Sequence, residues 1–325
     1  MKVFITRKIP QEGINLLQSA GIAFTEWIEK RELEQYELIE ICKKYDALIS
    51  VGQNKIDKHF LHECSHLKTV AQMAVGYDNI DIPEATKAKM PIGNTPGVLS
   101  KATADIAFLL MLAASRKAFF MHKKIIEGKW EFYDPTADLG IQVEGKTLGI
   151  FGLGKIGFEM AKKCAGAFDM KVIYHNRTNN AKAEKELNAK KVSLDELLSQ
   201  SDVLSVHTAL TPETKKNFDY GKFSKMKRTA IFINTARGAI HNEPDLIRAL
   251  NEKLIWGAGL DVTNPEPMRP DNPLLQMPNV AVLPHIGSAT EETRGAMSRL
   301  AAENIIAASK GERLPHVVNP EVYNS

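Results

Sequence analysis

Short apolar runs alternate with amphipathic helical patterns along most of the chain, and this alternation forms two blocks. In the first block, residues 1–10, 46–51 and 67–73 predict strands, and residues 32–44 predict a helix. The second block begins at residue 147 and is more regular. Its predicted strands and main helices are Thr147–Phe151, Lys155–Phe168 (helix), Lys171–His175, Asp202–His207, Thr229–Asn234, Glu243–Asn251 (helix), Ile255–Asp261 and Val280–Leu283. Strands that alternate with helices are typical of parallel sheets covered by helices, so we expect two α/β domains.

Two further helical runs, Ala102–Ala118 and Glu291–Ala308, lie between the blocks and after the second block. We interpret both runs as connections between the domains. If the second run returns the chain to the first block, the outer domain is discontinuous. The expected division is an outer domain of residues 1–99 plus 287–325 and an inner domain of residues 100–286.

The composition narrows the classes of function. A formal net charge of +3 over 325 residues, without a basic run, does not favour nucleic acid as the main partner. The three cysteines form no CxxC pair, as is usual in a reducing compartment. The first residues lack the apolar core of a signal peptide, and no stretch of about eighteen apolar residues occurs. We therefore expect a cytoplasmic protein without a membrane span.

A glycine-rich turn follows the first strand of the second block. Gly152, Gly154 and Gly157 form the pattern G-x-G-x-x-G directly after a predicted strand and at the start of a predicted helix. The first glycine permits the tight turn, the second lets the backbone approach a pyrophosphate, and the third lets the helix pack closely on the sheet. The helix N-terminus offers N–H groups to phosphate oxygens. The turn predicts a dinucleotide site, with a glycine turn that binds no ligand as the less favoured alternative.

The end of the next predicted strand bears on which dinucleotide binds. An acidic residue at this position commonly accepts hydrogen bonds from the ribose of NAD, but this chain has Asn176, Arg177 and Thr178. The missing acid and the adjacent guanidinium favour the 2′-phosphate of NADP. NAD bound through other contacts, with Arg177 as a solvated loop residue, stays open as an alternative.

Three side chains that suit carbonyl reduction lie just beyond predicted strands in the last third of the chain. They are Arg237, Glu266 and His285, each next to a proline or glycine. Hydride addition to a carbonyl leaves negative charge on oxygen, and a histidine, with an ordinary pKa of about 6.5, can supply the proton. A carboxylate can orient that ring, and an arginine can bind a substrate carboxylate and polarise the carbonyl. Each residue could instead be structural, because sequence spacing does not show that the three meet.

At these residues the chain resembles the D-isomer-specific 2-hydroxyacid dehydrogenases, especially the glyoxylate/hydroxypyruvate reductases among them. The matching segments, in the family order, are AVGYDNID (74–81), NTPGVLSKATAD (94–105), GLGKIG (152–157), INTARG (233–238), GAGLDVTNPEP (257–267) and LPHIGSAT (283–290). The resemblance covers nearly the whole chain. It implies two Rossmann-like, doubly wound parallel-sheet domains around a cleft, the outer one for the substrate and the inner one for the dinucleotide.

The resemblance also implies roles for individual residues. Arg237 would bind the substrate carboxylate and carbonyl, His285 would be the general acid, and Glu266 would be its carboxylate partner. The backbone of Val75 and Gly76 would hold the substrate carboxylate. The implied cofactor contacts are Thr103, Gly152, Leu153, Gly154, Lys155, Ile156, Gly157, Asn176, Arg177, Thr178, Thr235, Ala236, Asp261 and Gly287. Members of the family are usually homodimers through the cofactor domain, and residues 130–142 resemble their dimer arm.

The expected function is the reduction of glyoxylate, hydroxypyruvate or a related short 2-oxo acid to the D-2-hydroxy acid by NADPH. Within the same chemistry, a 3-phosphoglycerate dehydrogenase and a 2-ketogluconate-type enzyme are alternatives. From a different class, a dinucleotide-sensing corepressor-like binding protein also uses this fold. Partner binding that depends on the dinucleotide, without turnover, would favour that reading.

Two sets of histidines could suggest other chemistry. His59, His62 and His66 share one helix face with Cys64 nearby, but no second group with metal-ligand spacing is recognisable, so we expect no metal site. His207 ends a predicted strand without a glutamate partner. We expect it to line the adenine side of the cofactor rather than to replace His285 as the acid.

Overall fold

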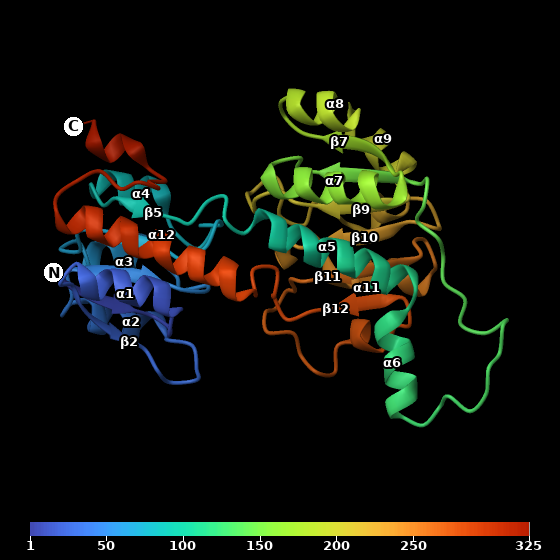
Figure 1. The fold of residues 1–325 in the computed structure, drawn as a ribbon, viewed down its shortest axis with the longest axis horizontal. Helices are drawn as coiled ribbons and strands as arrows, with labels where there is room; N and C mark the ends of the chain where they lie inside the picture. Colours follow the sequence, from blue (N-terminus) through green and yellow to red (C-terminus); the bar gives the residue numbers. More distant parts are fainter. Residues whose placement is uncertain (325) are drawn as a thin grey trace. The chain divides into compact units, whose positions relative to one another are not determined.

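The computed structural model describes residues 1–324, which divide into two compact units (Figure 1). Unit 1 comprises Met1–Leu99 together with the chain from Ala289 onward, and unit 2 comprises Ser100–Ser288. Each unit contains one parallel sheet with helices packed against it. The predicted fold class, two doubly wound α/β domains, is therefore confirmed.

Unit 1 has a five-stranded parallel sheet with the order β2-β1-β3-β4-β5. Its strands are β1 (Lys2–Ile5), β2 (Ala23–Glu26), β3 (Ala47–Ser50), β4 (Val70–Gln72) and β5 (Ile92–Gly93). Its helices are α1 (Gln11–Ser19), α2 (Gln35–Cys42), α3 (Lys58–Glu63), α4 (Ile82–Lys87) and α12 (Glu291–Ser309), followed by the 3-10 helix η3 (Pro320–Tyr323). The three central strands are apolar and buried over most of their length, because helices pack on both faces of the sheet.

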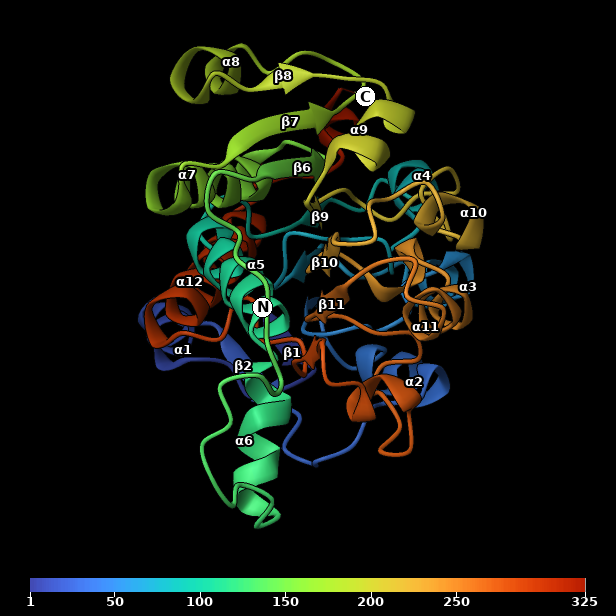
Figure 2. The ribbon, with the colours of Figure 1, turned by 90° about the vertical axis from the view of Figure 1, so that its right-hand side faces the viewer.

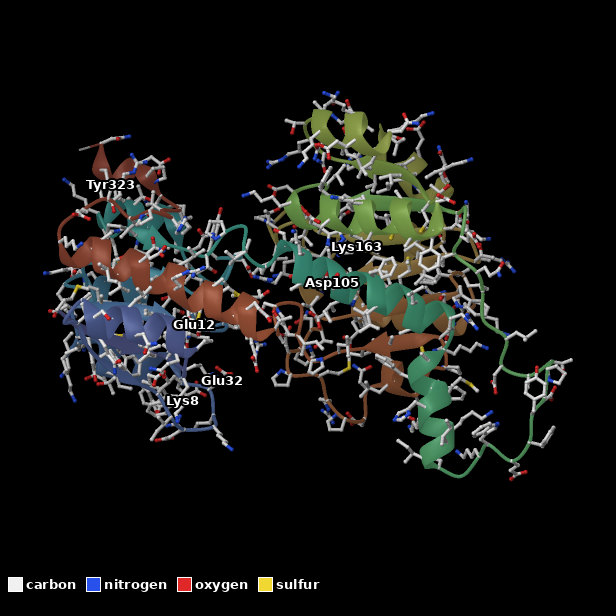
Figure 3. All side chains as sticks on the ribbon, viewed as in Figure 1. Lys8, Glu12, Glu32, Asp105, Lys163 and Tyr323 are labelled. Carbon is white, nitrogen blue, oxygen red and sulfur yellow. The ribbon has the colours of Figure 1, made fainter. Side chains whose placement is uncertain are left out.

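Helix α12 belongs to unit 1 although it comes from the C-terminal part of the chain. It crosses α1 at close range, and Gly13 N donates a hydrogen bond to Ser298 Oγ over 3.1 Å. A methyl group at Gly13 would lie 2.5 Å from Ser298 O, so only glycine fits at this crossing. One turn away, Glu12 on α1 (labelled in Figure 3) lies against Gly295 of α12. Residues without side chains thus allow the returning helix to dock on the N-terminal part of the unit.

Unit 2 has a seven-stranded parallel sheet with the order β12-β11-β10-β9-β6-β7-β8. Its strands are β6 (Thr147–Phe151), β7 (Lys171–His175), β8 (Lys190–Lys191), β9 (Val203–Val206), β10 (Ile231–Asn234), β11 (Gly257–Leu260) and β12 (Val280–Val282). Its helices are α5 (Ser100–Ser115), α6 (Ala118–Ile126), α7 (Lys155–Phe168), α8 (Ala181–Leu187), α9 (Leu194–Gln200), α10 (Tyr220–Phe223) and α11 (Glu243–Asn251), with the 3-10 helices η1 (Gly238–Ile240) and η2 (Pro273–Gln276).

Helices α5 and α7 cover one face of this sheet, and α9, α10 and α11 cover the other (Figure 2). Each face has its own buried apolar cluster, one around Leu110 and Met111 of α5 and one around Phe232 of β10. An ion pair of 2.7 Å between Asp105 and Lys163 joins α5 to α7 at the surface (Figure 3). Burial on both faces explains why these strands read as nearly continuous apolar runs in the sequence.

The predicted C-terminal end of the helix over Ala102–Ala118 is wrong. Helix α5 stops at Ser115, because Lys117 adopts a left-handed conformation with φ of 55° and interrupts the helical hydrogen bonds before α6 begins. After α6, residues 127–146 form an extended arm that leads to β6 (Figure 1). Large apolar side chains are exposed on α6 and on this arm, namely Phe119, Ile125, Ile126, Trp130, Phe132, Tyr133 and Leu139.

Three strands were not predicted, and all three lie at sheet edges. They are β2, β5 and β8, and β8 consists of two exposed lysines. An edge strand contacts a neighbour on one side only, so it can be short and polar and carry no apolar run. By contrast, β6, β7, α7 and α11 begin and end at the predicted residues. No helix within residues 1–324 is long and apolar enough to cross a membrane.

Candidate active site

The strand order of unit 2 changes direction at β6, which lies between β7 and β9. Strands β6 to β8 follow one another toward one edge of the sheet, whereas β9 to β12 follow one another toward the opposite edge. In open parallel sheets, ligands bind beyond the carboxyl ends of the strands at such a change of direction. The candidate residues in this unit lie mainly in the loops that leave the carboxyl ends of β6, β7, β10, β11 and β12.

The glycine-rich turn joins β6 to α7 at this point. Gly152 has a φ of 93°, and a Cβ atom there would lie 2.8 Å from Thr208 N. A Cβ atom at Gly157 would lie 2.9 Å from Gly152 O, so glycine is what lets the helix pack this close. A Cβ atom at Gly154 would have no neighbouring atom within 4 Å, so the space beside this residue is open. No side chain caps α7, so the N–H groups of Lys155 and the following residues face an open space that suits a phosphate.

Asn176, at the end of β7, braces this turn. Its Oδ1 accepts a hydrogen bond from Leu153 N at 2.6 Å, and its Nδ2 donates to Leu153 O at 3.2 Å. Asn180 Nδ2 donates to the same carbonyl at 2.9 Å. The carboxamide of Asn176 is thus engaged by the turn, while the next two side chains, Arg177 and Thr178, are exposed.

His207 follows β9 and lies directly against the glycine turn. Desolvation lowers the pKa of its ring to about 3, so the ring is neutral at pH 7. Its Nε2 lies 2.8 Å from Ser205 Oγ, and its Nδ1 lies 3.5 Å from Thr235 Oγ1. A neutral ring with these partners supports the turn and has no proton to deliver at neutral pH.

The structure brings His285 and Glu266 together, with His285 Nδ1 2.5 Å from Glu266 Oε1. The His285 side chain is 41% exposed, so the rest of its ring is open to a ligand. Burial acts to raise the pKa of the Glu266 carboxyl, but the hydrogen bond from His285 and the charges of His285 and Arg237 outweigh it and hold the pKa below its ordinary value. Glu266 is therefore ionised at neutral pH and accepts the hydrogen bond from the ring.

Arg237 lies in the loop after β10, and Asn234 holds that loop. Asn234 Nδ2 donates to Arg237 O at 2.8 Å, and its Oδ1 accepts from Ala236 N at 3.0 Å. The adjacent Gly238 packs against the loop that carries Glu266, because a Cβ atom at Gly238 would overlap Thr263 O. The loops after β10, β11 and β12 therefore bring the arginine, the glutamate and the histidine to one edge of the sheet.

Asp261, at the end of β11, positions the loop of His285. Its carboxylate accepts hydrogen bonds from Ile286 N and Gly287 N, both at 2.8 Å. His285 itself has a φ of 54°, which a non-glycine residue rarely adopts. The two hydrogen bonds to Asp261 hold the two residues that come directly after it. Burial raises the pKa of Asp261 although both bonds oppose that shift. Thr103 Oγ1 completes the arrangement by donating to Gly287 O at 3.2 Å.

His241 and Asn234 belong to the same edge, and the sequence analysis assigned no role to either residue. His241 is 1% exposed, and desolvation lowers its pKa to about 4. Its Nδ1 accepts from Asn234 Nδ2 at 3.1 Å, so a neutral histidine stands behind the loop of Arg237. The family motif INTARG contains Asn234, but no pattern near residue 241 distinguishes this histidine from a solvated one.

In unit 1, Val75 and Gly76 follow β4 at the carboxyl edge of the five-stranded sheet. Asn94 Nδ2 donates to Val75 O at 3.0 Å, and Thr95 N donates to Ala74 O at 2.9 Å. The segment is thus held through its carbonyl groups, which leaves its N–H groups as the natural contacts for an anion.

The prediction that His59, His62 and His66 share one helix face is wrong, because α3 ends at Glu63 and His66 lies in the turn after it. Across residues 1–324, no group of three or more His, Cys, Asp or Glu side chains is arranged to hold a metal ion. His66 Nε2 lies 3.1 Å from Cys42 O, and Cys64 is fully buried. Cys64 is thus part of the core of unit 1, whereas His59, His62 and His66 are exposed.

The residues of unit 2 fit a nicotinamide dinucleotide. The open space beside Gly154 and the uncapped α7 suit a pyrophosphate, and Arg177 and Thr178 follow the adjacent strand β7. The remaining expected contacts, Thr103, Thr235, Ala236 and Gly287, lie on α5 or at the same carboxyl edge. The same sheet edge also carries the histidine–glutamate pair, a combination that suits an oxidoreductase.

Comparisons with known proteins also indicate a dehydrogenase. Residues 108–287 match the model of the D-isomer specific 2-hydroxyacid dehydrogenase, NAD binding domain. The chain is 44% identical to a glyoxylate reductase of Thermococcus litoralis, with 100% of this chain and 98% of that protein covered. The crystal structure of a glyoxylate reductase from Paecilomyes thermophila has a TM-score of 0.86 at 35% identity, with 98% of each chain covered.

A further solved structure is an NADPH-dependent glyoxylate/hydroxypyruvate reductase from Sinorhizobium meliloti in complex with NADP and malonate. It has a TM-score of 0.86 at 28% identity, with 98% of this chain and 97% of that chain covered. The chain belongs to the D-isomer-specific 2-hydroxyacid dehydrogenase family. Within that family it is similar to glyoxylate reductases, and its cofactor is a nicotinamide dinucleotide.

Proposed function

We propose that the chain reduces a short 2-oxo acid, glyoxylate or hydroxypyruvate, to the D-2-hydroxy acid, with NADPH as the hydride donor. The observation that carries the proposal is the 2.5 Å contact between His285 and Glu266 at the edge that also holds Arg237. The activities named for the similar proteins from Thermococcus litoralis and Sinorhizobium meliloti support this choice of substrate and cofactor.

His285 is the general acid in this proposal. Its Nδ1 donates to Glu266, so its Nε2 is the nitrogen that holds the proton for the carbonyl oxygen. The bound dinucleotide supplies the hydride that is added to the carbonyl carbon. Glu266 keeps the ring in this orientation and tautomer throughout, because its carboxylate is ionised at neutral pH.

Arg237 binds the substrate carboxylate and polarises the carbonyl group. A guanidinium presents two parallel N–H groups to a carboxylate and stabilises the negative charge that develops on the carbonyl oxygen. In unit 1, the backbone N–H groups of Val75 and Gly76 are the proposed contacts for a substrate carboxylate. Residues 1–99 plus 287–325 thus form the substrate domain, and residues 100–286 form the dinucleotide-binding domain.

NADPH is the preferred dinucleotide. No acidic side chain stands at the end of β7, and the carboxamide of Asn176 is engaged with Leu153. Arg177, the next residue, is exposed and can pair with a 2′-phosphate. The proposed cofactor contacts are the turn from Gly152 to Gly157, the loop from Asn176 to Thr178, and the positions Thr103, Thr235, Ala236, Asp261 and Gly287.

The functional form is a homodimer through unit 2. The apolar side chains on α6 and on the arm support this proposal, since Trp130, Phe132 and Tyr133 are each more than 65% exposed in the single chain. Such a concentration of exposed aromatic residues is typical of a surface that a partner covers. In a two-fold dimer, the same apolar surface of each copy is covered by the other copy.

The cytoplasm is the proposed location, with small molecules rather than nucleic acid as partners. All three cysteines are free thiols and buried, as expected in a reducing compartment. The net charge of +3 is small for a chain of 325 residues.

The test follows the oxidation of NADPH and NADH by the purified protein with glyoxylate, hydroxypyruvate, 3-phosphohydroxypyruvate and 2-ketogluconate. We expect the largest kcat/KM with NADPH and one of the first two acids. His285→Ala should lower kcat by about 10²–10⁴-fold, because the carbonyl oxygen then lacks its proton donor. His62→Ala, at an exposed histidine on α3, is the matched control and should leave kcat unchanged.

Each alternative has its own result in the same experiment. Turnover with NADH alone would refute the cofactor proposal and retain the chemistry. A preference for 3-phosphohydroxypyruvate or 2-ketogluconate would refute the substrate proposal. Unchanged kcat in His285→Ala would refute the role of His285 as the acid.

A further inference from the structure

The loop after β7, residues 176–180, is fastened to the protein from two sides. On the side of the glycine turn, Asn176 and Asn180 bind the backbone of Leu153. Toward the sheet, Asn180 N donates to the buried Tyr174 Oη at 2.8 Å. These bonds fix both ends of the loop but do not reach its middle, where Arg177 and Thr178 lie.

Lys191 fastens the middle of the loop. It lies on the edge strand β8, which pairs with β7 in a register that places Lys191 opposite Tyr174. Its Nζ donates to Arg177 O at 3.2 Å and to Asn179 Oδ1 at 3.0 Å. One ammonium group thus binds the residue on each side of Thr178, and it brings a positive charge to the backbone of Arg177.

Within residues 1–324, the cations of this loop have no directly paired carboxylate. Among the described residues, neither Arg177 nor Lys191 has a carboxylate within 4.0 Å. The charge of Arg177 contributes to the lowered pKa of the Glu213 carboxyl. It is the smallest of several causes, and a hydrogen bond from Thr211 is the main one. Two cations without an ion pair, Arg177 and Lys191, therefore lie together at this exposed loop.

A phosphate monoester carries between one and two negative charges at neutral pH, so a single exposed arginine balances it only in part. We infer that Lys191 is a specificity-determining and positioning residue for the 2′-phosphate of NADPH, a role that rests on the proposed preference for that cofactor. It acts in two ways. Its hydrogen bonds hold the backbone of Arg177, and its charge adds to that of the guanidinium.

The neighbouring residue provides a matched control. Lys190 is on the same strand, is equally exposed and carries the same charge. Successive side chains of a strand point to opposite faces, so Lys190 points away from the side on which Lys191 contacts the loop. Lys190→Met and Lys191→Met therefore remove the same charge from the same strand, but only the second removes the contacts with Arg177 and Asn179.

The experiment measures equilibrium binding by titration calorimetry, without turnover. The probes are adenosine 2′,5′-bisphosphate and adenosine 5′-monophosphate, which differ only in the 2′-phosphate. We expect Lys191→Met to weaken binding of the bisphosphate about tenfold relative to the monophosphate, as loss of a charge-assisted contact predicts. Lys190→Met should change that ratio by less than about twofold, and Lys191→Arg should restore most of it. The salt dependence of bisphosphate binding should also become shallower in Lys191→Met.

The outcomes separate the two proposals. If the unmodified protein binds both nucleotides equally, the preference for NADPH fails and the role of Lys191 fails with it. If the unmodified protein prefers the bisphosphate but Lys191→Met and Lys190→Met have equal effects, the preference stands and the role of Lys191 is refuted. A selective loss in Lys191→Met supports both.

Discussion

The two units present different groups at the carboxyl edges of their parallel sheets. In unit 2 the edge carries ionisable side chains, and another side chain holds each of them: Glu266 holds His285, and Asn234 holds the loop of Arg237. In unit 1 the corresponding edge carries the backbone of Val75 and Gly76, which Asn94 holds through a carbonyl group. In the proposed function, the same architecture thus serves proton transfer in one unit and backbone recognition of an anion in the other.

This difference separates the effects that substitutions should have. A change at the edge of unit 2 alters groups that act in the transition state, so it should appear in kcat. A change at the edge of unit 1 alters only the position of a binding segment, so it should appear mainly in KM. Each of the following predictions uses a residue behind the edge rather than one that touches substrate.

The largest effect is expected for Asp261→Asn. Each carboxylate oxygen accepts one of the two bonds, and the NH2 group that replaces one oxygen can only donate, so the loop that holds His285 at a φ of 54° loses one of its two hydrogen bonds. We expect kcat to fall about a hundredfold, the upper end for loss of one hydrogen bond to a charged group. Steady-state kinetics with saturating cofactor measure it.

Asp271→Asn is the control for that variant, because Asp271 is an exposed acid of the same unit whose partner is Arg269. Equal kcat values in the two variants would show that Asp261 does not position His285. A change confined to KM would place Asp261 in ground-state binding instead.

An intermediate effect is expected for the pH dependence of stability in unit 2. The folded-state pKa of His241 is about 4, below the ordinary value for histidine of about 6.5. The stability that follows from this shift is present above about pH 6.5 and is lost as the pH falls toward 4. Between pH 7 and 5 we expect His241 to account for a loss of about 2 kcal/mol in the free energy of unfolding.

Urea unfolding of the unmodified protein and of His241→Phe at the two pH values tests this. The variant lacks the titrating ring, so its stability should depend less on pH, although His207, with a pKa of about 3, adds a slope of the same sign. His122→Gln, at an exposed histidine on α6, should keep the full slope. Identical slopes in all three proteins would contradict the buried neutral state of His241.

The smallest effect is expected for Asn94→Ala in unit 1. This change removes the hydrogen bond from Asn94 Nδ2 to Val75 O and loosens the segment that we propose as a substrate-binding segment. We expect KM for the 2-oxo acid to rise about threefold to tenfold with little change in kcat, which corresponds to one neutral hydrogen bond. Asn15→Ala on the exposed face of α1 is the control. A fall in kcat without a change in KM would remove the contrast between the two units.

Patterns within a few residues were enough to predict the fold class and much of unit 2. Strands β6 and β7 are continuous buried runs and helices α7 and α11 are buried along one face, so their bounds follow from apolar residues and turn glycines. The glycine turn was recognisable because two of its glycines meet a local requirement, a positive φ at Gly152 and close contacts at Gly157. The assignment of roles to individual site residues stays a prediction.

Features that depend on distant parts of the chain were not predictable in this way. The edge strands β2, β5 and β8 exist because a neighbouring strand pairs with them, and their own residues show no apolar run. Asn176 and Leu153 are 23 residues apart, Asp261 and Gly287 are 26 apart, and Glu266 and His285 are 19 apart. Local sequence specifies which elements form, whereas a hydrogen bond across such a separation exists only once the parallel sheet has brought the ends of its strands to one edge.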